Sequence, residues 1–130
     1  MPRAYTVATA ALALDVPAKW VDNILSHHTV PGVAQERQGI ARKLTIDGLL
    51  VLALTSFLIQ ELGVPLPKAI GIAEHLLRKE GRYESPRGFS LMLDLSTFRA
   101  NLLERLEDAV EMAPAPRRGR PAANKTGRLD

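Results

Sequence analysis

Cysteine is absent from this chain, which excludes a disulfide framework and a thiolate metal site. No apolar run reaches the roughly 20 residues that a bilayer-spanning helix needs. The first residues lack the basic segment followed by an apolar run that marks a secretory signal. The glycines outside turns stand singly, so no phosphate-cradling loop is evident, and no nucleophile, base and orienting group can be assembled. We therefore expect a cytoplasmic protein that does not span a membrane and is not an enzyme.

The net charge of +3 is unevenly distributed along the chain. Residues 114–130 carry five basic side chains and one acidic side chain, whereas residues 1–113 carry 12 basic and 13 acidic ones. The tail is also rich in proline, arginine and glycine, a composition that does not sustain a packed structure. A near-neutral body with a basic, disordered tail favours nucleic acid as the partner. The alternative is a solubilising tail without a partner.

Residues 45–62 are apolar on nearly every side of a helix, and not on one stripe only. Such a pattern is typical of a membrane span or of a helix in the middle of a globular core, and the run is too short for the former. Thr45 is a suitable N-cap, Asp47 suits the positive end of the helix dipole, and Gly63 ends the helix. We predict a buried central helix on which the other helices pack.

Two short helices are predicted before this central helix, over residues 5–14 and 17–28. Pro17 interrupts the pattern between them, because it pushes the residue before it out of the helical region. Two short helices joined by a tight turn are typical of a helix-turn-helix unit, whose second helix enters the major groove of DNA. The second helix has one face for the core, formed by its apolar residues Trp20, Val21, Ile24 and Leu25. Its polar residues off that face are candidate DNA contacts: Lys19, Asn23 and His27.

A two-stranded hairpin is predicted between the second helix and the central helix. Residues 30–34 and 40–44 are its strand candidates, and Pro31-Gly32 and Gln38-Gly39 are its turn signals. The hairpin would carry basic residues beside the second helix, and these are further candidate DNA contacts: Arg37, Arg42 and Lys43.

The C-terminal half is predicted to contain a helix over residues 67–79, packed antiparallel on the central helix, a strand over residues 89–95, and a last helix capped by Ser96 or Thr97. The last helix has an apolar stripe formed by Phe98, Leu102, Leu106 and either Val110 or Ala109. This stripe would either close the core or make a two-fold contact with a second copy. We favour the homodimer contact, because the core already has enough helices.

The order of these elements resembles the MerR-like winged helix-turn-helix family. The step Arg42-Lys43-Leu44-Thr45 is similar to the family's R-x-x-T entry into a long helix, and residues 61–66, ELGVPL, resemble its "long helix, E-L-G-x-P-L, short helix" ending. The resemblance covers about residues 5–80. It implies a mainly α fold with a small β-hairpin wing and a DNA-binding function. The family's metal sensing is not implied, because this chain lacks the cysteines and the long coiled coil of its activators.

The tail has a resemblance of its own, because it contains the R-G-R-P core of an AT-hook. A narrow A·T minor groove has an enhanced negative potential that attracts inserted arginines. The glycine lets the backbone lie close to the groove floor, and the proline keeps the strand extended. The candidate minor-groove residues are Arg117, Arg118, Gly119, Arg120 and Pro121.

These predictions describe a winged helix-turn-helix over residues 1–81, a dimerisation segment over residues 82–113 and a disordered basic tail over residues 114–130. The expected function is that of a homodimeric transcriptional regulator that binds double-stranded, A·T-rich DNA in the nucleoid. We expect no metal or other cofactor, because the adjacent residues His27 and His28 form a poor chelate. The alternative is an antitoxin-like or adaptor module that binds a protein partner. Residues 1–48 carry only five basic against four acidic side chains, which favours the alternative, whereas the wing arginines and the tail favour DNA binding.

Overall fold

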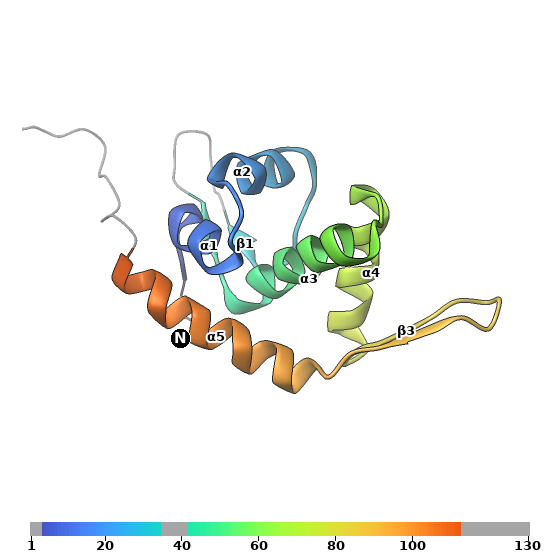
Figure 1. Cartoon of the computed structure of the whole chain (residues 1–130). Helices are drawn as coiled ribbons and strands as arrows, with labels where there is room; N and C mark the ends of the chain where they lie inside the picture. Colours follow the sequence, from blue (N-terminus) through green and yellow to red (C-terminus); the bar gives the residue numbers. More distant parts are fainter. Residues whose placement is uncertain (1–3, 35–41, 113–130) are drawn as a thin grey trace, which may run out of the picture.

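The computed structural model describes residues 4–34 and 42–112 (Figure 1). Within these ranges the chain forms five helices and two antiparallel two-stranded sheets, as the predicted mainly α class requires. In chain order the elements are α1 (Val7–Leu14), α2 (Ala18–His27), β1 (Val33–Ala34), β2 (Lys43–Leu44), α3 (Ile46–Leu62), α4 (Leu66–Arg78), β3 (Arg82–Glu84), β4 (Ser90–Met92) and α5 (Leu95–Met112). None of these helices combines the length and the apolar character that a bilayer span needs.

The helix α3 is the centre of the core, as its sequence predicts. The Thr45 side chain accepts a hydrogen bond from the backbone N–H of Gly48, and Gly63 ends the helix in the left-handed conformation with φ 68°. Residues 49–52 are completely buried, and the hydroxyl of Thr55 donates to the carbonyl of Val51 at 2.7 Å. Burial does not extend around the whole helix, however, because the side chains of Phe57 and Leu62 are 49% and 57% exposed.

The strands β1 and β2 confirm the predicted first hairpin, although each is only two residues long. Leu44 of β2 is completely buried and pairs with Val33 of β1. On its other side Leu44 pairs with Tyr5, with backbone N–O distances of 2.8 and 3.0 Å. The chain before α1 thus adds a third strand-like partner, which joins the hairpin to the helical core.

A second hairpin, β3–β4, follows α4. The predicted strand over residues 89–95 is present only as Ser90–Met92, and its partner strand β3 was not predicted. The two strands are joined by a turn in which the N–H of Gly88 donates to the carbonyl of Ser85 at 3.1 Å. At the base, Leu93 donates to the carbonyl of Gly81, whose φ of 95° and close approach to Leu93 both require glycine. This hairpin projects away from the helices (Figure 1).

The last helix begins earlier than predicted, and Asp94 caps it instead of Ser96 or Thr97. The Asp94 carboxylate accepts hydrogen bonds from the backbone N–H of Thr97 at 3.0 Å and from its hydroxyl at 2.8 Å. These bonds favour the charged carboxylate and so lower the pKa of Asp94 below its ordinary value of 3.8. Because the pKa is lowered in the folded state, this cap contributes its full stability above pH 3.8 and loses it as the pH falls through the lowered pKa.

The apolar stripe of α5 lies against α1 and α3 and closes the core of the same chain. Leu102 and Leu106 are 3% and 1% exposed, so the prediction that they form a dimer contact is wrong. Phe98 is half-buried against the core, and Val110 is 39% exposed. The neighbouring Ala109 takes the buried position next to Val110. Since α5 packs on α1, the predicted boundary after residue 81 does not separate two independent cores.

Candidate nucleic-acid interface

The helices α1 and α2 meet at a corner of three residues. Thr6 caps α1 by accepting a hydrogen bond from the N–H of Thr9 at 3.1 Å. Asp15 ends α1 in the left-handed conformation with φ 56°, and Pro17 then precedes the first residue of α2. The helix α2 is held on the core by Val21 and Ile24, which are 0% and 2% exposed. Trp20, expected with them in the core, is only half-buried.

The opposite face of α2 carries the three polar residues that the sequence singled out. Lys19, Asn23 and His27 are four residues apart, so they lie in one row along the helix, and all three are exposed. The ring Nδ1 of His27 lies 2.8 Å from the carbonyl oxygen of Asn23, which orients the imidazole along the helix. The side-chain amide of Asn23 makes no hydrogen bond within the described ranges. Its donors and its acceptor are therefore free for an external partner.

The basic residues predicted on the first hairpin differ in what they do. Lys43 of β2 is exposed. Arg42 instead points to α2, where its guanidinium lies 3.1 Å from the Asp22 carboxylate and 3.2 Å from the Ser26 hydroxyl. The Arg42 side chain is only 20% exposed, and its contact with DNA stays a prediction. Its guanidinium braces the hairpin against α2 and neutralises the one acidic side chain of that helix.

Sequence reasoning missed this brace, although a signal for it was present. Asp22 and Ser26 are four residues apart and hence adjacent on one edge of α2. An arginine on a hairpin predicted to lie beside that edge is the natural partner of both groups, because its planar donors can reach a carboxylate and a hydroxyl together.

The remaining predicted contacts lie outside the described residues. This applies to Arg37 and to the tail residues Arg117, Arg118, Gly119, Arg120 and Pro121. In the described ranges, no three His, Asp or Glu residues come together in a way that would hold a metal ion.

Comparisons of the chain with protein-family models, with curated proteins and with solved structures give no significant match. The assignment of a function therefore depends on the geometry of α2 and its surroundings.

Proposed function

We propose that this chain is a sequence-specific DNA-binding protein, and that α1, α2 and the β1–β2 hairpin form a winged helix-turn-helix. The observation that carries the proposal is the outer face of α2, where Lys19, Asn23 and His27 are exposed in one row and the Asn23 amide has no partner among the described residues. The major groove of DNA admits one α-helix, and polar side chains on its outer row meet base edges there.

Each of the three side chains has a chemistry that base edges can satisfy. Asparagine pairs bidentately with N6 and N7 of adenine, and lysine donates to O6 and N7 of guanine. His27 offers a ring nitrogen at the C-terminal end of the row. The Arg42–Asp22 ion pair supports the same role, because it removes a negative charge that would repel phosphate.

Phosphate attraction must come largely from elsewhere, since residues 1–48 are nearly neutral. Lys43 beside α2 is one candidate, and the basic residues 117–121 are the other, as an arm in an A·T-rich minor groove. Both contribute chiefly by neutralising phosphates, so binding should weaken steeply as salt is added.

The test begins with mobility shifts on genomic fragments, including the region upstream of the protein's own gene, at two salt concentrations. With a bound sequence in hand, Asn23→Ala should cost about 1–3 kcal/mol at one base position and relax discrimination there. Lys43→Ala should weaken binding evenly across sequences and lower the salt slope by about one. Lys68→Ala, an exposed lysine on α4, is the matched control and should change neither.

Equal loss on every sequence would reject Asn23 as a base reader. Absence of any shift by the full chain at low salt would reject DNA binding itself. The second candidate, an adaptor that binds another protein, is favoured by the β3–β4 hairpin, which exposes Phe89 and Met92 at 59% and 78%.

A further inference from the structure

The β3–β4 hairpin and the two residues at its base, Gly81 and Leu93, form an arm (residues 81–93) that packs on little of the described structure. Its main contact within the described residues is α4, where the rings of His75 and Tyr83 meet edge-to-face with centroids 5.3 Å apart. Beyond this contact the arm extends into solvent (Figure 1). A lone two-stranded hairpin is marginally stable in water, so packing on a further surface would stabilise this arm.

One face of the arm carries three large apolar side chains. Tyr83 and Leu91 pair across the two strands and are half-buried at the base. Phe89 lies two residues before Leu91 and therefore shares its face, but it lies near the tip and is 59% exposed. Met92, 78% exposed, lies on the opposite face, across from Arg82. The Phe89 face thus continues past the core, and no other part of the described chain covers Phe89 fully.

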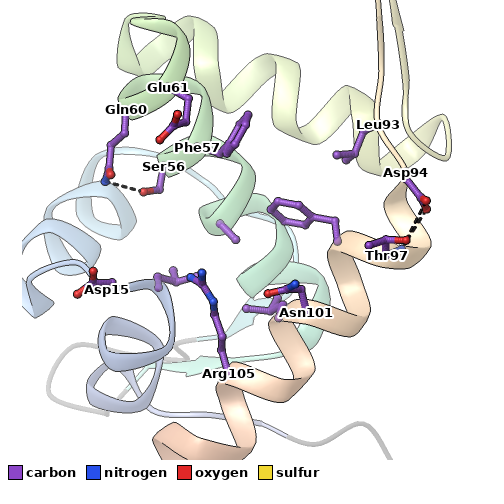
Figure 2. A pocket seen from close by; sticks show the side chains of 14 residues that line it. Asp15, Ser56, Phe57, Gln60, Glu61, Leu93, Asp94, Thr97, Asn101 and Arg105 are labelled. Carbon is purple, nitrogen blue, oxygen red and sulfur yellow. Dashed lines mark hydrogen bonds between the residues drawn. The ribbon is translucent and has the colours of Figure 1, made fainter.

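A groove of about 550 Å³ begins where the arm ends, between α3, α5 and the end of α1 (Figure 2). It contains two aromatic rings, those of the half-exposed Phe57 and of Phe98. Three carboxylates surround these rings, and Arg105 is the one basic side chain of the lining. The carboxylates belong to Asp15, Glu61 and Asp94.

We propose that the arm of a second copy of this chain occupies this groove, with Phe89 against Phe57 and Phe98. The charges are complementary: Arg87 at the arm's tip has no ion-pair partner in the described ranges, and three of the four charged side chains that line the groove are acidic. Arg82, by comparison, lies 3.8 Å from Glu84 of its own arm.

Reciprocal exchange follows from where the arm and groove meet. The arm and the groove both start at residues 93 and 94. The arm projects away from α5, the helix that lines the groove (Figure 1), so it does not cover the groove of its own chain. A two-fold axis near this junction can place the arm of the second copy along the groove of the first. The same rotation then places the arm of the first copy along the groove of the second. Each copy then covers the other in the same way, as a closed two-fold dimer requires. This inference concerns the chain without DNA and does not depend on the proposed function.

Sedimentation of the full chain without DNA tests the exchange. We expect the wild type to be a dimer at about 50 μM, and Phe89→Asp or Phe57→Asp to weaken association about 100-fold or more, because each removes both symmetric contacts. An equimolar mixture of the two variants should recover a dimer, since one intact arm then meets one intact groove. Met92→Asp, on the opposite face of the arm, is the matched control and should remain dimeric.

Charge reversal provides a second pair of variants at exposed positions that do not affect folding. Arg87→Glu and Glu61→Arg should each weaken the dimer, and their mixture should restore it. A monomeric wild type, a dimeric Phe89→Asp variant, or two variant pairs that fail to recover on mixing would each overturn the proposal. A wild-type dimer that binds no DNA would uphold it and reject the proposed function; a monomer that binds DNA would do the reverse.

Discussion

The two hairpins of this protein have similar strand lengths but opposite relations to the core. In β1–β2, Leu44 is completely buried, Tyr5 pairs with it as a third strand-like partner, and Thr45 donates to the carbonyl of Gly32 from both its N–H and its hydroxyl. In β3–β4 the described contacts are concentrated at the base, and Phe89 near the tip is 59% exposed.

This difference shows what fixes a short hairpin in a small helical protein. Strands of two or three residues supply too few hydrogen bonds to be stable alone. The first hairpin is held because a third segment and the core residues of α3 surround it. The second projects from α4, and Phe89 on its apolar face is largely exposed. Three measurements of folding stability test this difference between the hairpins. The largest effect is expected in the first hairpin.

Leu44→Ala should lower the free energy of unfolding by about 2–5 kcal/mol, because it removes a completely buried side chain and leaves a cavity between β2 and the helices. Leu91→Ala in the second hairpin is the matched control. Its side chain is only half-buried, so the loss should stay below about 2 kcal/mol. Urea denaturation measures both, and equal losses would mean that the two hairpins are anchored alike.

The edge-to-face contact of Tyr83 with His75 should contribute about 0.5–1.5 kcal/mol to the stability of the arm's base. A double-mutant cycle of Tyr83→Leu and His75→Ala isolates this contribution. Strictly additive losses would show that the rings do not hold the arm on α4 and that its anchor lies elsewhere.

The smallest effect is expected for the ion pair between Arg42 and Asp22. The Asp22 side chain is 51% exposed, so solvent screens the pair and a coupling of about 0.2–1 kcal/mol is expected. The cycle uses Arg42→Gln and Asp22→Asn, with urea denaturation at low and high salt. A coupling that does not decline at high salt would contradict an ionic brace and favour the hydrogen bond to Ser26 as its main component.

Local sequence signals determined much of the fold. The caps at Thr6 and Thr45, the αL glycine at Gly63 and the break before Pro17 set helix ends within a few residues, because capping and backbone restrictions act over one turn. The all-round apolar pattern of α3 likewise identified the central helix. The row of Lys19, Asn23 and His27 was predictable too, since residues four apart share a helix face once the apolar residues are assigned to the core.

Only the tertiary structure decided where each apolar stripe goes. The stripe of α5 was consistent with a dimer contact or with the core, and the choice was made by α1, which packs on α5 as Leu102 and Leu106 become buried. The same applies to Phe57 and Phe89, which have core-like chemistry but lie where no other part of the described chain covers them. Arg42 likewise pairs with Asp22, and does not extend into solvent, because the fold places the first hairpin beside α2. Periodicity records which face of an element is apolar or charged, whereas the partner of that face depends on segments distant in sequence, whose positions are set by packing.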